Sequence, residues 1–265
     1  MKKKRFFGIY YKHQTVDGYT LAVISSTSNE GDMIQVITNE KSYLIKDISS
    51  VDISFKGIKF DVHQEDISLT GYIGYGELLI PKKDIMSYYR FLPIECKHKI
   101  YSMYQSLSGE ITLNNKVISF NNGSGYIEGD RGVNFPKEYL WINAINSDAS
   151  ITLAIATIPF KLFVIKGITT LITYKNKEYR FGTYNGAKIL KLSKENIVIK
   201  KGKYLLSIDI PPNSGHPLKA PIKGDMVRYI HECPCSEIHY VLKRKDEVIM
   251  DITHPYASIE YMFNK

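Results

Sequence analysis

Short runs that alternate between hydrophobic and polar residues follow one another along most of the chain, with turn residues between them. Side chains in a strand point alternately to its two faces, so this period of two indicates strands. Gly109–Leu113 and Lys116–Phe120, for example, flank Asn114-Asn115, a pair typical of a tight hairpin turn. No segment has the hydrophobic period of a long helix. The pattern therefore predicts an all-β protein with little helix, built as a barrel or a sandwich.

Other boundaries follow from the turn residues. Lys56-Gly57 is the predicted turn of a second hairpin, and the proline- and glycine-rich stretch Asn213–Gly224 is a predicted loop. Met226–His231 and Ile238–Lys243 are predicted to be separate strands.

The length of 265 residues suits two β domains of ordinary size. We expect two antiparallel β-barrels packed together, the first over residues 1–122 and the second over residues 123–265. A ligand could enter either barrel mouth or the junction between the barrels.

Charge and cysteine content change this picture little. The formal charge is +8, but the lysines are scattered, which is typical of a solvated surface; contact with an acidic membrane surface stays open. No nucleic-acid motif accompanies the charge, so we expect no nucleic-acid partner. No apolar run approaches the roughly 20 residues of a membrane-spanning helix. The basic start of the chain lacks a signal-peptide pattern, and the three cysteines suit a reducing compartment, so we expect a cytoplasmic protein.

The stretch Gly123–Asn143 holds the only tryptophan, Trp141, together with two closely spaced carboxylates. If this stretch is extended, Tyr126, Glu128 and Asp130 share one face. Where such a face is enclosed, desolvation and mutual repulsion raise the pKa of one carboxyl group, which can then donate a proton near neutral pH. The alternative is a solvated strand face that ends in a glycine-rich turn.

The same stretch resembles the tocopherol cyclase-like family. GYIEGDRG at residues 125–132 and FPKEYLW at residues 135–141 are similar to its Gly-Tyr-x-Glu-x-Asp-Trp-Gly pattern and the Phe-Pro and aromatic strand that follow. Further similar elements are FGIYYKH (7–13), ECKH (95–98), FGTYNGA (181–187) and PLKAP (217–221). Two family tryptophans are replaced here, by Ile9 and by Arg131.

The resemblance implies a lipocalin-like fold of two barrels, related to carotenoid hydratases. It also implies an enzyme that needs no metal or redox cofactor: an acid protonates an alkene of a prenylated quinol-type lipid, and cyclisation or hydration follows. Aromatic faces can stabilise the resulting cation. The alternative is a non-catalytic protein that binds a hydrophobic small molecule in the same cavity. The oligomeric state is left open.

Asp130 is the expected proton donor, with Glu128 raising its pKa or replacing it, and Glu95 and His98 form a second candidate catalytic pair. Arg131 would lower a neighbouring carboxyl pKa unless it points to the opposite face, as strand alternation predicts. The expected substrate-binding residues, which could also be plain core, are Tyr126, Arg131, Tyr139, Trp141, Tyr11 and Tyr184.

His231, Cys233, Cys235 and His239 carry thiol and imidazole groups that can bind zinc. The Cys-Pro-Cys spacing is tighter than zinc sites use, so we expect no metal there.

Overall fold

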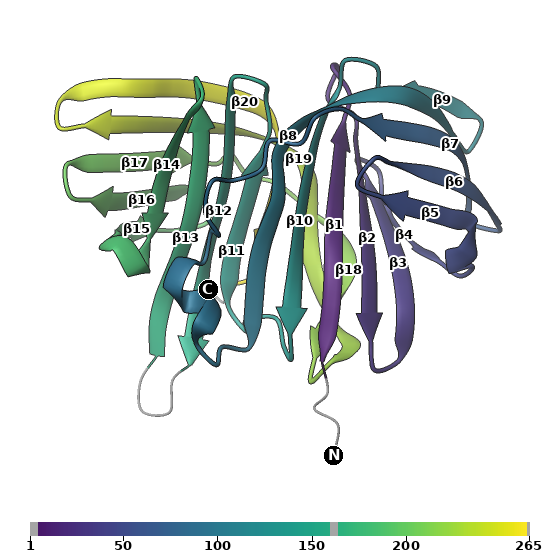
Figure 1. Ribbon diagram of the computed structural model, residues 1–265, viewed down its shortest axis with the longest axis horizontal. Coiled ribbons are helices and arrows are strands. Elements are labelled where there is room, and N and C mark those ends of the chain that lie inside the picture. Colours follow the sequence, from purple (N-terminus) through teal and green to yellow (C-terminus); the bar gives the residue numbers. More distant parts are fainter. Residues whose placement is uncertain (1–4, 160–163, 264–265) are drawn as a thin grey trace.

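The computed structural model describes residues 5–159 and 164–263. These residues form two antiparallel sheets of ten strands each (Figure 1). The first sheet has the order β4 (Ser42–Ile45), β3 (Gly31–Thr38), β2 (Thr20–Ser28), β1 (Phe6–Gln14), β10 (Ser124–Gly132), β8 (Cys96–Leu113), β7 (Ile67–Tyr75), β6 (Gly57–Gln64) and β5 (Val51–Ser54), with β9 (Lys116–Ser119) paired to β8.

The second sheet repeats this order. Its strands run β14 (Lys177–Gly182), β13 (Val164–Tyr174), β12 (Ala149–Pro159), β11 (Tyr139–Ala144), β20 (Glu247–Tyr261), β19 (Asp225–Arg244), β17 (Tyr204–Asp209), β16 (Asn196–Lys201) and β15 (Lys188–Leu192), with β18 (His216–Ile222) paired to β19. Thus β11 corresponds to β1 and β20 to β10. The described residues also form three short 3₁₀ helices, η1 (Ile48–Ser50), η2 (Ser87–Phe91) and η3 (Thr183–Asn185).

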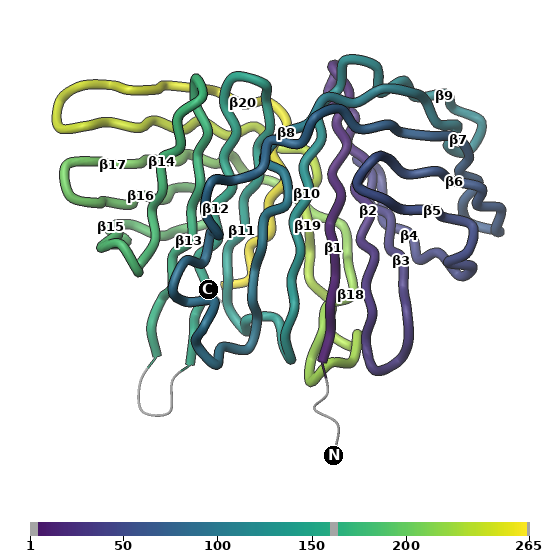
Figure 2. The backbone as a smooth tube through the Cα atoms, viewed as in Figure 1, coloured from purple at the N-terminus to yellow at the C-terminus, as the bar shows by residue number. Residues whose placement is uncertain are grey.

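Each sheet curls around its own core, and a third core lies between the sheets. Strand β8 runs from the middle of the molecule to the outer end of its sheet (Figure 2). The central strands are buried on both faces: Tyr11 and Ile127 belong to the core of the first sheet, whereas their neighbours Tyr10 and Tyr126 belong to the third core. The prediction of two packed, lipocalin-like β units is confirmed, although hydrogen bonds between described strands do not close either sheet.

Two predicted hairpin turns can be compared with the strands. The Asn114-Asn115 turn is confirmed, and both residues have the positive φ angles that such a turn requires. The second predicted hairpin forms between β5 and β6, but its turn is Phe55-Lys56 and not Lys56-Gly57, because Gly57 already pairs with Ser54 in the ladder.

The predictions around β19 also need correction. The loop 213–224 contains β18, and the two strands predicted nearby form the single strand β19. Register shifts between Cys233 and Ile238 accommodate Pro234, which has no N–H to give to the ladder.

The chain passes from one sheet to the other between Gly132 and Tyr139. Strand β10 pairs with β1 and β8, so it lies in the first sheet, although the predicted boundary at residues 122 and 123 assigned it to the second unit. The division into two separate domains stays a prediction.

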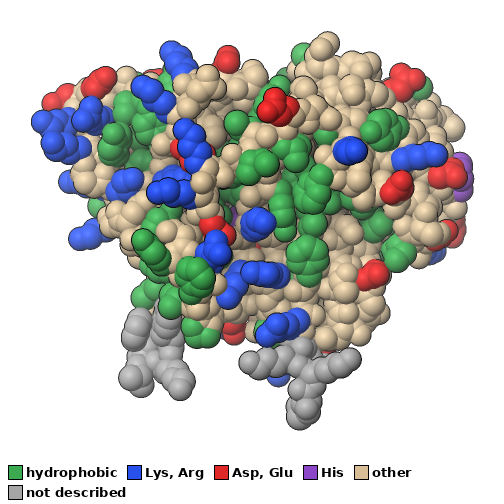
Figure 3. Space-filling model, viewed as in Figure 1, with side chains coloured by type: hydrophobic (Ala, Val, Ile, Leu, Met, Phe, Trp, Pro, Cys, Tyr) green, Lys and Arg blue, Asp and Glu red, His purple; other side chains and the backbone are tan. Residues whose placement is uncertain are grey.

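Lysine and arginine side chains spread over several elements on one face, with hydrophobic side chains between them (Figure 3). In the part of the chain that the structure describes, no helix has both the length and the apolar character needed to cross a membrane.

Candidate active site

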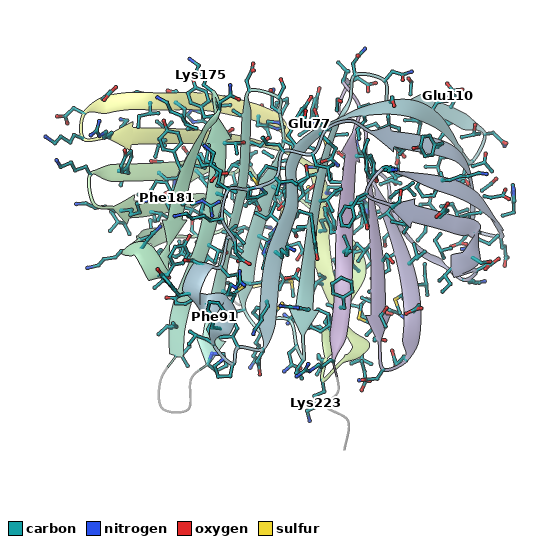
Figure 4. The ribbon with its side chains drawn as sticks, in the orientation of Figure 1. Glu77, Phe91, Glu110, Lys175, Phe181 and Lys223 are labelled. Atoms are coloured by element: carbon teal, nitrogen blue, oxygen red, sulfur yellow. The ribbon has the colours of Figure 1, made fainter. Side chains whose placement is uncertain are left out.

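A cavity of about 180 Å³ lies between the two sheets. Both sheets and the segment around η2 contribute to its mostly apolar lining, which includes Ile9, Ile24, Met86, Phe135, Trp141 and Ile230. Tyr89 on η2 lines the cavity, whereas Phe91 at the end of η2 is exposed (Figure 4). A largely apolar cavity with a few polar groups is the usual form of a small-molecule site.

Strand β10 places two carboxyl groups in this cavity. Tyr126, Glu128 and Asp130 alternate along the strand, as predicted, and face the second sheet. Glu128 is buried, so the alternative of a solvated strand face is wrong. The side chain of Arg131 is exposed and does not line the cavity.

Donors from both sheets surround Glu128. The hydroxyl group of Tyr126 donates to Oε2 at 2.6 Å, and the indole Nε1 of Trp141 donates to the same oxygen at 3.1 Å. His98 Nε2 lies 2.9 Å from this oxygen as an ion pair, outside hydrogen-bond geometry. These contacts hold the carboxyl group of Glu128 in one position through its Oε2.

His98 lies directly opposite Asp130 in the β8–β10 ladder. Burial alone would lower the pKa of His98, but the neighbouring carboxylates of Glu128 and Asp130 outweigh burial and raise it to about 9. Imidazolium is therefore the main form at neutral pH.

Asp130 is the carboxyl group of β10 whose pKa is raised toward neutrality. Burial and the nearby Glu128 raise its pKa to about 6, although the charge of His98 opposes them. The thiol of Cys96 donates to Asp130 Oδ1 at 3.4 Å. Asp130 can therefore exchange a proton near neutral pH inside an apolar cavity.

The second sheet adds two carboxyl groups that the sequence analysis did not single out. Glu260 lines the cavity and accepts a hydrogen bond from the Tyr139 hydroxyl group. Glu232 lies opposite Glu260 in the β19–β20 ladder and accepts a 2.5 Å hydrogen bond from Tyr10 of the first sheet. Burial raises the pKa of both groups, to about 7 for Glu232 and well above the usual range for Glu260.

The remaining sequence candidates lie at varied distances from this group. Glu95 is exposed at the rim of the cavity, where its Oε1 accepts a hydrogen bond from Asn134. Tyr139 and Trp141 line the cavity from β11, on the same face. Tyr11 belongs to the core of the first sheet, and Tyr184 packs edge to face against Tyr89 outside the cavity lining. Of the expected substrate-binding residues, Tyr126, Arg131, Tyr11 and Tyr184 do not line the cavity.

The residues considered for zinc are not gathered into a site. Among residues 5–159 and 164–263, no group of three or more His, Cys, Asp or Glu side chains is arranged to hold a metal ion. His239 instead contacts Asp251, with Nε2 and Oδ1 2.6 Å apart.

No protein family and no curated protein matches the sequence, so the resemblance to the tocopherol cyclase-like family stays a prediction. Solved structures do share the fold. Kievitone hydratase from Nectria haematococca has a TM-score of 0.54 at 10% identity, over 97% of this chain and 88% of its own. CghA has a TM-score of 0.63 at 8% identity, over 99% and 90% of the two chains, and its complex with Sch210972 has a TM-score of 0.62 at 8% identity, over 97% and 88%. At these identities the likeness establishes the fold.

Proposed function

We propose that the protein is an enzyme that protonates a carbon–carbon double bond of an apolar small molecule and then closes a ring or adds water. The observation that carries the proposal is the position of Asp130: a carboxyl group with a pKa of about 6, beside the buried His98–Glu128 pair, in an apolar cavity. An acid of this kind supplies the proton that such additions require.

Asp130 gives its proton to one alkene carbon, which forms a C–H bond and leaves a cation on the other carbon. The rings of Tyr10 and Trp141, which meet near the cavity, can stabilise this cation. A hydroxyl oxygen of the substrate or of water then bonds to the cationic carbon, and its proton returns to Asp130. No atom of the enzyme is consumed.

The resemblance described above supports a prenylated quinol-type lipid as the substrate and cyclisation as the reaction. The shared fold of kievitone hydratase supports hydration as the related reaction of the same acid. Peripheral contact with a membrane surface would give access to such a lipid.

The test is incubation with a prenylated hydroquinone, followed by mass spectrometry and NMR of the products. We expect a ring-closed isomer or a hydrate, and a loss of at least about 100-fold in rate for Asp130→Asn, the range typical of general acid catalysis. Asp61→Asn, which alters an exposed carboxylate, is the matched control. Equal rates for Asp130→Asn and the unchanged protein would refute the assignment of the acid.

The second candidate function is non-catalytic binding of a hydrophobic molecule. The observation in its favour is the largely apolar lining of the cavity. Tight binding of the hydroquinone without any product would support this function instead.

A further inference from the structure

We propose that Glu260, held by Tyr139, binds a carbonyl or phenolic oxygen of the ligand, so that the ligand is an apolar molecule with an oxygen function at one end. This inference deepens the proposed function by naming the ligand class. It concerns a residue outside the motif that suggested the acid, and it rests on three observations.

The first observation is the position of Glu260. Its side chain is 8% exposed and lines the cavity from β20, in the second sheet, whereas Asp130 lines it from β10, in the first. A ligand between the sheets can therefore meet both groups.

The second observation is the free capacity of Glu260. Among the residues that the structure describes, Tyr139 is its only hydrogen-bond partner, and it reaches Oε2. Glu232 Oε2 is completely buried and has no hydrogen-bond partner, whereas Glu260 Oε1 is not among the oxygens buried in this way. Glu128 is held more firmly, because Tyr126 and Trp141 both donate to its Oε2 and His98 also contacts that oxygen.

The third observation is the charge around Glu260. Glu232 lies opposite it on β19, Glu128 and Asp130 face it from β10, and the Tyr139 hydroxyl group contacts it from β11. Arg228 acts on Tyr139 and gives its hydrogen bonds to the backbone oxygens of Pro136 and Lys137. Burial and the neighbouring carboxylates raise the pKa of Glu260 well above its ordinary value, which favours the neutral carboxylic acid form of this group.

A neutral carboxylic acid has one O–H donor. In an apolar cavity an acceptor oxygen of the ligand stabilises this donor, because a buried donor without a partner has lost its hydrogen bonds to water. A ketone, quinone or phenol oxygen provides that acceptor, whereas a pure hydrocarbon leaves the group unpaired. The cavity should thus discriminate between a ketone and a hydrocarbon of the same shape.

The experiment is titration calorimetry with decalone and decalin, which have the same ring system with and without a carbonyl group. The wild-type protein should bind decalone at least about tenfold more tightly, as expected for one buried hydrogen bond. Glu260→Gln keeps a donor and should keep the preference, whereas Glu260→Leu should lose it. Asp61→Asn, which alters an exposed carboxylate outside the cavity, is the control and should keep it.

Equal affinities for the two ligands in the wild-type protein, or a preference that survives in Glu260→Leu, would overturn the inference. Circular dichroism and thermal melting establish that each variant is folded. Binding is measured without turnover, so Asp130→Asn should keep the preference. If no product forms from the hydroquinone while the preference depends on Glu260, the proposed reaction fails and this inference stands.

Discussion

The rings of Tyr10 and Trp141 meet edge to face, with their centroids 5.4 Å apart. They lie on β1 and β11, the corresponding strands of the two sheets. Each gives its hydrogen bond to a carboxyl group of the opposite sheet: Tyr10 to Glu232 and Trp141 to Glu128. Glu232 and Glu128 therefore each depend on a donor from the opposite sheet.

Tyr10→Phe should lower the free energy of unfolding by about 1–3 kcal/mol, the cost of leaving a buried polar group without its partner. Glu232 Oε2 already lacks a partner, and the substitution would also remove the donor to Oε1. Urea denaturation at neutral pH measures the change. Tyr88→Phe, which removes an exposed hydroxyl group, is the control and should be nearly neutral; equal effects of the two substitutions would contradict the importance of this bond.

His98→Gln should cost about 3–5 kcal/mol near pH 6, because it leaves Glu128 buried without its cation. The pKa of His98 rises from an ordinary 6.5 to about 9 on folding, so the ion pair stabilises fully below pH 6.5 and is lost as the pH rises through 9. The difference between the two proteins should shrink over that window, as measured by denaturation at several pH values.

His63→Gln is the control for this experiment, since His63 faces Asp61 on the surface. Its effect should stay small at every pH. A cost for His98→Gln that does not change with pH would mean that packing, rather than charge, is responsible.

The rate of the proposed reaction should be constant at low pH and fall as the pH rises through about 6, where Asp130 loses its proton. The expected decline is about tenfold for each pH unit above this value. Initial rates with the prenylated hydroquinone measure the profile. A rate that increases through pH 6 would instead identify the ionised carboxylate as the active form.

Gly132→Ala should destabilise the protein by about 1–3 kcal/mol, because a Cβ atom there would lie 1.9 Å from the backbone oxygen of Glu95. Gly8→Ala is the matched substitution, since its Cβ would meet Ser26 Cβ at an ordinary 3.5 Å. Thermal denaturation of both variants checks the difference. Comparable losses would show that the backbone around Gly132 moves away easily.

The face shared by Tyr126, Glu128 and Asp130 could be predicted because it depends only on the alternation of side chains along one strand. The hairpin at Asn114-Asn115 could be predicted for a similar reason, since its turn residues carry the required backbone angles. Both features are local in sequence.

Glu232 and Glu260 could not be found in this way. They become neighbours only when β19 and β20 pair, and Glu260 reaches the cavity only when the second sheet packs against the first. Glu232 stands between His231 and Cys233, whose chemistry suggested a metal site instead. That β19 is one continuous strand could not be predicted either. Pro234 indicates a strand end in the sequence, whereas in the structure it lies in an irregular part of the ladder.

The burial of the central strands on both faces has a consequence for how the chain folds. Every residue of β11 is buried, with Leu140 and Ile142 in one core and Tyr139 and Trp141 in another. A half-length chain that contained only the second sheet would expose the latter pair to water. Each half therefore needs the other to cover its apolar face. The whole molecule should melt in one cooperative transition.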